Sequence, residues 1–210
     1  MQRRAVVVGG AGALGRAVCA ALRGAQWQVA SVDLRASGEA AVSFAAPSDA
    51  KLREWARPGL DAVVCVAGGF EMGGLEAAEG DALARKMFDM NAASSLGAAQ
   101  LAVRSLTENG LLVLTGAQTA FAGRTGFAVG YGMSKAAVHH LAGDVGAAFR
   151  GSGRRVVCML PTTIDTPANR AAMPDADFSK WTRPEAIAQQ VLAWAASTRG
   201  LSETDIFKQV

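Results

Sequence analysis

Short apolar runs rich in β-branched residues alternate with alanine-rich segments of helical spacing along the whole chain, and this alternation limits the folds it can adopt. The runs with the character of buried strands are residues 5–8, 29–32, 62–66, 111–114 and 156–160. The segments with helical spacing are 14–23, 50–56, 81–106, 131–149 and 184–196. Two weaker runs, 42–44 and 205–210, predict further edge strands. Because right-handed crossovers place each helix over a sheet, the order predicts a doubly wound parallel α/β fold.

Composition agrees with one globular domain over residues 1–210. Half of the residues are hydrophobic and 19% are charged, a balance that excludes intrinsic disorder. A chain of this length buries about 70% of its unfolded surface, so it needs no disulfide or metal to hold a core. Cys19, Cys65 and Cys158 show no C-x-x-C spacing and lie in apolar segments, which predicts buried, reduced thiols.

Charge and hydropathy also bear on location and partners. Charge-free stretches such as 110–123 fall short of the roughly 20 apolar residues that a membrane span requires. The apolar run near the N-terminus is too short for a signal peptide, so we expect a cytoplasmic protein. The net charge of +3 is spread along the chain, which makes nucleic acid and membrane surfaces poor partners.

A glycine-rich turn joins the first predicted strand to the first predicted helix. Gly9, Gly12 and Gly15 have G-x-x-G-x-x-G spacing, and Ala13 and Leu14 open the helix between them. Such a turn lets backbone N–H groups approach a pyrophosphate at the positive end of a helix. A tight turn without a ligand is the alternative for the loop taken alone, but its position after a strand favours a Rossmann-type dinucleotide site.

An acidic residue closes the second predicted strand. Asp33, followed by Leu34, stands where a carboxylate accepts hydrogen bonds from the adenosine ribose and repels a 2′-phosphate. Arg16 and Arg35 favour the phosphorylated cofactor instead. The carboxylate acts at shorter range than solvated arginines, so we expect NADH to be preferred, with NADPH remaining possible.

Tyr131, the only tyrosine, precedes Lys135 by four residues. On a helix this spacing puts both side chains on one face, where the ammonium lowers the pKa of the phenol and favours proton transfer. The alternative is an exposed aromatic residue beside an exposed lysine. A dinucleotide loop upstream in the same sheet favours the catalytic interpretation.

The motifs together resemble the short-chain dehydrogenase/reductase superfamily over the whole chain. They are the glycine loop, the segment Val66-Ala67-Gly68-Gly69, Asn91, the Tyr131/Lys135 pair and the segment from Pro161 to Thr166. Within the superfamily, the segments 65–69, 130–135, 160–167 and 173–181 are similar to the quinoid dihydropteridine reductases. The last segment lies where substrate-capping segments vary most, so it bears most directly on the substrate.

The resemblance implies roles for individual residues. Tyr131 would donate the proton, while Lys135 would bind the nicotinamide ribose and tune the tyrosine. Asn91 matches the catalytic helix asparagine that supports a proton-relay water, although pteridine reductases do not typically rely on it. The remaining implied cofactor contacts come from two loops: Ala67, Gly68, Gly69, Pro161, Ile164 and Thr166.

The superfamily's catalytic serine, about thirteen residues before the tyrosine, is replaced here by Gln118, with Thr119 following. Pteridine reductases also lack this serine, because a quinonoid pterin is already an electron-poor acceptor. Phe70 and Trp181 are candidates either for ordinary packing or for a flat wall against a pterin ring. His139 and His140 are adjacent and cannot form an i, i+4 metal pair, so we expect no metal site. We expect His139 at the surface or a dimer interface; the alternative is a position near the active face, because it follows Lys135 by four residues.

These features favour an NADH-dependent reductase of quinonoid dihydropterin. The alternatives are a reductase of the same fold acting on a carbonyl or another pterin, and a non-catalytic dinucleotide-sensing protein. The segments 91–106 and 131–149 are rich in small residues, and the superfamily pairs the equivalent helices across a two-fold axis. We therefore expect a homodimer.

Overall fold

A computed structural model of the chain describes residues 2–57, 59–197 and 206–210. One sheet of seven parallel strands has the order β3-β2-β1-β4-β5-β6-β7, which confirms the predicted doubly wound fold. The strands are β1 (Arg4–Val8), β2 (Gln28–Val32), β3 (Val42–Phe44), β4 (Leu60–Cys65), β5 (Leu106–Thr115), β6 (Arg155–Leu160) and β7 (Phe207–Gln209).

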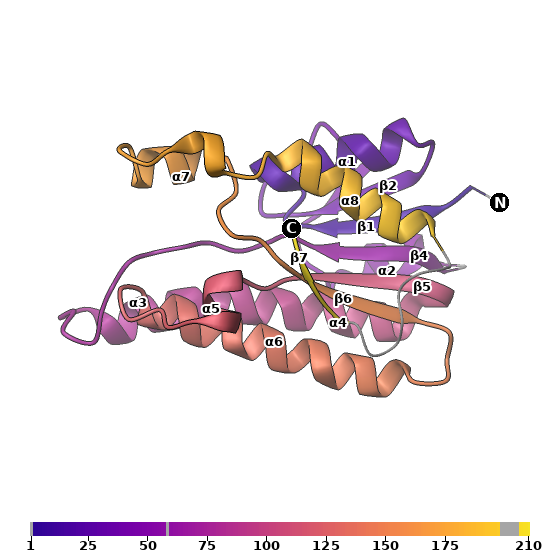
Figure 1. Cartoon of the computed structure of the whole chain (residues 1–210). Coiled ribbons are helices and arrows are strands. Elements are labelled where there is room, and N and C mark those ends of the chain that lie inside the picture. The colour runs from indigo at the N-terminus through magenta and orange to yellow at the C-terminus, as the bar shows by residue number, and fades with distance from the viewer. Residues whose placement is uncertain (1, 58, 198–205) are drawn as a thin grey trace.

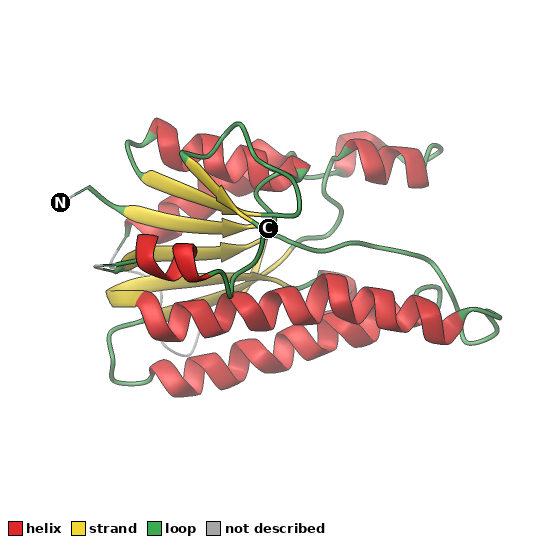
Figure 2. Cartoon of the chain, turned by 180° about the vertical axis from the view of Figure 1, so that it is seen from behind, coloured by secondary structure: helices red, strands yellow, loops and turns green. Residues whose placement is uncertain are grey.

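Helices cover both faces of the sheet (Figures 1 and 2). On one face lie α1 (Ala13–Gly24) and α8 (Pro184–Ala196), which pack against each other. On the other face lie α2 (Ala50–Trp55), α4 (Ser94–Ser105) and α6 (Val129–Phe149). Shorter helices α3 (Gly80–Met87), α5 (Gln118–Ala122) and α7 (Pro167–Ala172) and a 3₁₀ turn at Phe178–Lys180 lie beyond the sheet.

The core consists of two apolar layers, one on each face of the sheet. Alternate residues of each central strand enter opposite layers, so that Val6 and Val63 face α4 and α6 while Val7 and Val64 face α1 and α8. A parallel sheet covered on both faces needs nearly continuous apolar strands, which is what the sequence supplies. Cys19, Cys65 and Cys158 are buried and unpaired, as predicted.

The helix predicted over 81–106 differs from the structure in two ways. It is interrupted by a π-helical turn at Phe88–Ala93, where the Asn91 side chain turns inward to bond the chain after β4. It also ends at Ser105, because Leu106 already pairs with Leu60 as the first residue of β5. The register of β4 and β5 shifts after that pair, and Asn109 adopts a left-handed conformation with φ +65°. The predicted strand 111–114 is therefore the regular half of a longer strand.

Other elements follow the predictions within a few residues. The weak run 42–44 forms the edge strand β3, and the run 205–210 contains β7, while Asp205 lies outside the described residues. α5, α7 and the 3₁₀ turn were not predicted because three to six residues are too few to show helical periodicity. No helix in the described ranges combines the length and apolarity needed to cross a bilayer.

Candidate active site

The residues singled out in the sequence gather at one edge of the sheet. All seven strands are parallel, so their carboxyl ends meet at the same edge. The strand order reverses between β1 and β4, and ligands of such sheets bind at this switch point. The glycine loop follows β1, Asp33 follows β2, Ala67 follows β4, and Pro161 follows β6.

The glycine loop is shaped by contacts that exclude side chains. Gly9 has φ +87° and donates its N–H to the Val32 carbonyl at 2.8 Å. A Cβ on Gly9 would overlap the Ala67 backbone, and a Cβ on Gly15 would overlap the Gly9 carbonyl oxygen. Gly9 requires glycine because the loop passes so close to the chain after β4, and Gly15 because α1 begins so close to the loop's own backbone.

The start of α1 suits an anion. Gly12 occupies the N-cap and offers no side-chain acceptor, and the first turn contains no acidic residue. The N–H groups of Ala13, Leu14 and Gly15 belong to the first turn, which lacks intrahelical acceptors. The Leu14 side chain is buried, so that residue can meet a ligand only through its backbone. A diphosphate would satisfy these donors and the positive end of the helix.

The Asp33 carboxylate is hydrogen-bonded to the glycine loop. Its Oδ2 accepts the Ala11 N–H at 3.0 Å, and its Oδ1 accepts the Arg35 N–H at 3.2 Å. Arg16 donates from Nη1 to the Ala11 carbonyl at 2.7 Å, so its guanidinium is held on the loop's own backbone. Leu34, the next residue, is 96% exposed. Asp33 therefore both shapes the loop and presents a carboxylate beside it.

The Asn91 side-chain amide links the loop after β4 to α6 by hydrogen bonds. Its Oδ1 accepts the Gly69 N–H at 3.0 Å, while its Nδ2 donates to the Gly69 carbonyl at 3.1 Å and to Ser134 Oγ at 3.0 Å. Its own carbonyl accepts the Ser95 hydroxyl at 2.7 Å. A Cβ on Gly68 would overlap Asn91 Oδ1. The buried amide thus fixes Gly69 through two hydrogen bonds and lies too close to Gly68 for a side chain there.

Tyr131 and Lys135 lie one turn apart on α6, with Lys135 Nζ 5.8 Å from the centre of the tyrosine ring. Lys135 is 4% exposed and Tyr131 is half-buried, so the alternative of two exposed side chains is wrong. Burial raises the pKa of Tyr131 to about 12. The prediction that the ammonium lowers this pKa is therefore wrong here, because desolvation of the phenolate dominates. Tyr131 is a protonated phenol at neutral pH.

Lys135 is bound to the end of β5. Its Nζ donates to the Thr115 carbonyl at 2.8 Å. Burial lowers the pKa of Lys135 to about 8, and the neighbouring thiols Cys65 and Cys158 oppose the shift. Sequence reasoning did not identify Thr115 or Ser134 as partners of the site. Ser134 was visible only as a polar residue between Tyr131 and Lys135 in the sequence.

Phe70 and Trp181 differ in their relation to Tyr131. Phe70 packs edge-on against the Tyr131 ring with centroids 5.0 Å apart. Trp181 instead pairs with Phe178 at 4.7 Å, inside the segment after α7. Phe70 therefore borders the tyrosine directly, whereas Trp181 belongs to a separate aromatic pair in the predicted capping segment.

The loop after β6 connects to neighbouring segments through its backbone and through the Thr166 side chain. The Pro161 carbonyl accepts the Gln118 N–H at 3.1 Å, which joins this loop to the position of the missing serine. Ile164 bridges to Thr182, and Thr166 caps α7 by accepting the Asn169 N–H. The predicted nicotinamide loop is thus a defined connection between β6 and α7.

His139 lies near the active face, which was the alternative to the surface or interface position that we expected. Its ring is half-buried, its Nε2 accepts the Ala117 N–H at 3.2 Å, and Phe121 and Phe207 pack edge-on against it. The expectation of a surface position is wrong because α5 and β7 fold over this part of α6. Five residues are too few for α5 to show a period, and the sequence predicted β7 only as an edge strand, without showing that it packs against α6.

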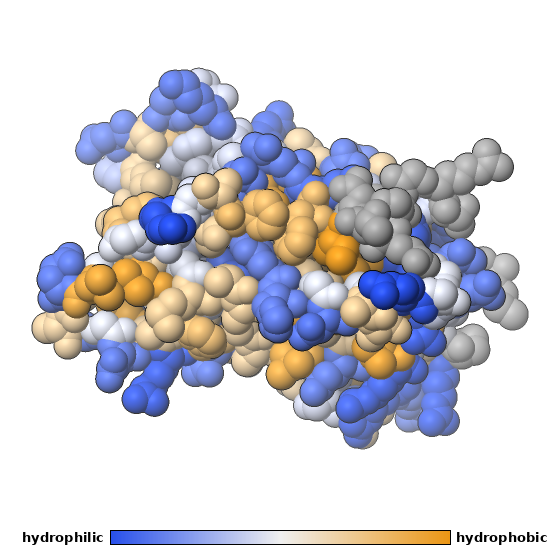
Figure 3. Space-filling view, turned by 60° about the horizontal axis from the view of Figure 1, so that its bottom comes forward, coloured by the Kyte–Doolittle hydropathy of each residue, from blue (hydrophilic) through white to orange (hydrophobic). Residues whose placement is uncertain are grey.

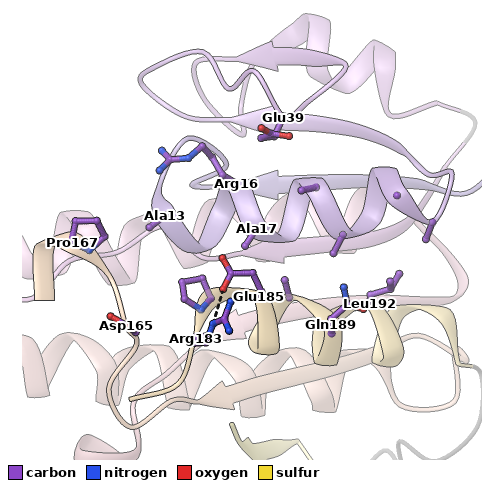
Figure 4. Close-up of a pocket in the computed structure, with 16 residues that line it drawn as sticks. Ala13, Arg16, Ala17, Glu39, Asp165, Pro167, Arg183, Glu185, Gln189 and Leu192 are labelled. Atoms are coloured by element: carbon purple, nitrogen blue, oxygen red, sulfur yellow. Dashed lines mark ion pairs between the residues drawn. The ribbon is translucent and has the colours of Figure 1, made fainter. Parts of the chain in front are cut away.

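A groove of about 910 Å³ runs between α1 and α8 (Figure 4). Small residues of α1 line it, together with Arg16, Glu39 and the Arg183–Glu185 ion pair of 3.5 Å. One end reaches Ala13, beside the glycine loop. Tyr131 and Lys135 are not among its lining residues, so the groove is distinct from the predicted catalytic pair.

Comparisons with known proteins agree with this arrangement. The enoyl-(acyl carrier protein) reductase family profile matches residues 32–198. Dihydropteridine reductase of Dictyostelium discoideum is 32% identical over 209 residues, covering 94% of this chain and 90% of that protein. Among solved structures, a doubly substituted variant of a Serratia marcescens short-chain dehydrogenase/reductase matches with TM-score 0.81 and 23% identity, covering 99% of this chain and 96% of that one. A short-chain type dehydrogenase/reductase from Mycobacterium ulcerans matches with TM-score 0.81 and 21% identity, covering 100% and 89%.

Proposed function

The chain belongs to the short-chain dehydrogenase/reductase family of oxidoreductases, and from that premise we propose that it reduces quinonoid dihydropterins with NADH. The observation that carries the proposal is the Tyr131/Lys135 pair on one face of α6, next to a segment where glutamine replaces the superfamily's serine. The full-length similarity to the Dictyostelium dihydropteridine reductase supports the same substrate class.

The residues present suit a nicotinamide dinucleotide. The uncapped first turn of α1 offers Ala13, Leu14 and Gly15 N–H groups to the diphosphate, and the loop around Gly9 leaves no room for side chains. Asp33 lies where its carboxylate can accept the adenosine ribose hydroxyls while keeping its bond to Ala11. This carboxylate supports a preference for NADH, with NADPH as the weaker ligand.

The loops after β4 and β6 complete the proposed cofactor site. Asn91 fixes Gly68 and Gly69 so that their backbone, with Ala67, can lie against the nicotinamide ribose. Pro161, Ile164 and Thr166 lie in the connection from β6 to α7, where backbone groups can hold the carboxamide end. Leu34, exposed after β2, would cover the adenosine end.

The reduced nicotinamide, when bound, supplies a hydride to the pterin. Tyr131 supplies the accompanying proton from its hydroxyl, which balances the reduction of quinonoid dihydropterin to tetrahydropterin. Lys135 binds the ribose and places a positive charge beside the phenol as the proton leaves. Asn91 acts as a positioning residue, because its amide is already bonded to Gly69 and Ser134.

A quinonoid acceptor suits a site of this composition. A ketone gains from a hydroxyl that polarises its carbonyl, whereas a quinonoid pterin is already electron-poor. Gln118 stands at the position of that hydroxyl, and the nearby Thr115 hydroxyl donates to the Cys65 carbonyl instead. Phe70, edge-on to Tyr131, offers an apolar flank for a flat ring.

The outer face of α4 and α6 supports a homodimer. Leu96 and Val103 on α4 and Met133 on α6 are about half exposed, at 48%, 45% and 52%. Figure 3 views the molecule from this side and shows apolar patches among polar side chains. The neighbouring exposed positions of α6 are mainly alanine and glycine, which permit close helix approach. A second copy would cover this face.

Steady NADH oxidation on adding a chemically generated quinonoid dihydropterin tests the proposal. Turnover that requires both substrates supports it. Turnover with carbonyl compounds alone would favour another reductase of the same fold. NADH binding without turnover on either class would favour a non-catalytic dinucleotide sensor.

A further inference from the structure

His139 accepts a hydrogen bond from the chain that leaves β5, one turn of α6 beyond Lys135. It follows Lys135 by four residues and Tyr131 by eight, so the three side chains lie on successive turns of one face of α6. The His139 Nε2 lies 3.2 Å from the Ala117 nitrogen, and Lys135 Nζ lies 2.8 Å from the Thr115 carbonyl oxygen. Two neighbouring turns of α6 therefore hydrogen-bond to Thr115, the last residue of β5, and to Ala117, two residues after it.

The close approach at this point restricts the chain. A Cβ on Gly116 would overlap both the His139 ring and the Cys158 sulfur. Gly116 also donates its N–H to the Met159 carbonyl at 2.9 Å, and Gln118 donates to the Pro161 carbonyl at 3.1 Å. Residues 115–118 are thus held by α6 on one side and by β6 and its loop on the other.

The ring itself is fixed in orientation. Phe121 of α5 and Phe207 of β7 stand nearly perpendicular to it, at 81° and 88°. A backbone N–H can only donate, so Nε2 must be unprotonated and the proton of the neutral ring must be on Nδ1. Burial, with a further contribution from Lys135, lowers the pKa of His139 to about 4, which keeps the ring neutral over the working range of most enzymes.

We propose that His139 is a positioning residue for the reductase site, whose Nε2 fixes the end of β5 so that the Thr115 carbonyl faces the Lys135 ammonium. The proposal rests on the proposed function for its catalytic consequence, but the geometry it describes exists without substrate. Lys135 interacts with ionisable groups on three elements: Cys65 on β4, Cys158 on β6, and Tyr131 and His139 on α6. The Thr115 carbonyl is the neutral acceptor among these partners, and it stabilises the charged form of Lys135.

Two substitutions separate the effect of losing the hydrogen-bond acceptor from the effect of losing the aromatic ring. His139→Phe keeps an aromatic ring between Phe121 and Phe207 but presents C–H to the Ala117 N–H. His139→Gln loses the ring but can place Oε1 near the former Nε2. A packing role predicts that Phe is tolerated better than Gln, whereas a positioning role through the acceptor predicts the reverse order.

With NADH and a quinonoid dihydropterin, we expect His139→Phe to lower kcat about 3- to 10-fold, the range for one lost neutral hydrogen bond. The alkaline limb of its pH profile should move to lower pH. At pH values well below that limb, the KM for NADH should stay within about twofold, because Lys135 is charged in both proteins and the diphosphate contacts are unchanged. His139→Gln should recover most of the kcat. Activity of the Phe variant equal to or above that of the Gln variant would overturn the proposal.

Two NMR measurements test the geometry without any substrate. With ¹⁵N-labelled histidine, and with His140→Gln to remove the only other histidine, the His139 ring should show the Nδ1–H tautomer with Nε2 as acceptor. Lys135 Cε shifts, assigned with Lys135→Arg, should give a lower pKa in His139→Phe than in the parent protein and in His140→Gln. An Nε2–H tautomer, or an unchanged Lys135 pKa in a folded Phe variant, refutes the proposal even if pterin reduction fails. If the Phe variant does not fold, the tautomer in the parent protein decides the question.

Discussion

Lys135 Nζ lies 5.8 Å from the centre of the Tyr131 ring and 2.8 Å from the Thr115 carbonyl oxygen, so one ammonium connects the phenol to the end of β5. The helix α6 places both side chains on one face, while the hydrogen bond to the Thr115 carbonyl holds the lysine ammonium at the end of β5. This relationship separates the roles of the two residues. The phenol can exchange a proton, and the ammonium can bind and stabilise negative charge.

Substitution of each residue should therefore give a different kinetic pattern. Tyr131→Phe removes only the hydroxyl, so NADH should bind normally while turnover falls by about 10² or more, the usual range for a lost general acid. Lys135→Ala removes a ribose contact and a charge, so it should weaken NADH binding as well as slow turnover. Steady-state kinetics and NADH fluorescence titration measure both effects.

The reactivity of a quinonoid acceptor makes the Tyr131 effect smaller than it would be with a ketone. The comparison between variants is therefore the stronger test. Full activity of Tyr131→Phe, together with normal NADH binding by the Tyr131→Phe/Lys135→Ala double variant, would remove both residues from the active site.

The pH dependence of turnover should be set by Lys135. Burial lowers its pKa to about 8, so the side chain is charged below that pH and neutral above it. Burial raises the pKa of Tyr131 to about 12, so the phenol keeps its proton throughout. NADH affinity and turnover should therefore fall as pH rises through about 8, whereas Lys135→Arg, which keeps its charge, should lose this alkaline limb. A parent profile that is flat from pH 7 to 10 would contradict the assignment.

The sequence predicted the parts of the fold that depend on long periodic segments. Buried strands such as β1 and β4 read as continuous apolar runs, and the pair Tyr131/Lys135 needs only the spacing within one helix. Gly9 and Gly15 were also predictable, because close backbone approach leaves a glycine pattern in the sequence.

Contacts between distant segments could not be predicted in the same way. The Asn91 amide reaches Gly69 only because a π-helical turn rotates it inward, and nothing in local spacing encodes that turn. His139 is covered by α5, which is too short to show a period, and by β7, which was predicted as an edge strand but could not be placed against α6 from the sequence. The pKa of Tyr131 was misjudged because the sequence shows its charged neighbour but not its burial.

Assembly can be tested through the outer face of α4. Leu96 is 48% exposed there, and a glutamate in its place would put a charge into an interface with a second copy. We expect the parent protein to have about twice the chain mass of 21.6 kDa at micromolar concentration, and Leu96→Glu to shift it toward the monomer. Val42→Glu, on the edge strand β3, is the matched control and should leave the mass unchanged. Light scattering that gives about 21.6 kDa for the parent protein would refute the homodimer.

Cofactor preference should depend on the charge of Asp33, and the structure shows how to separate that charge from loop stability. The carboxylate holds the Ala11 N–H at 3.0 Å, so Asp33→Ala removes a loop contact together with the proposed ribose contact. Asp33→Asn keeps an acceptor for Ala11 but removes the negative charge that would repel a 2′-phosphate. We expect the parent protein to bind NADH more tightly than NADPH. The Asn variant should reduce this difference in affinity mainly by binding NADPH more tightly, and the Ala variant mainly by binding NADH more weakly. Calorimetric titration with both cofactors measures each change, and equal affinity of the parent protein for the two would show that Arg16 or Arg35 dominates instead.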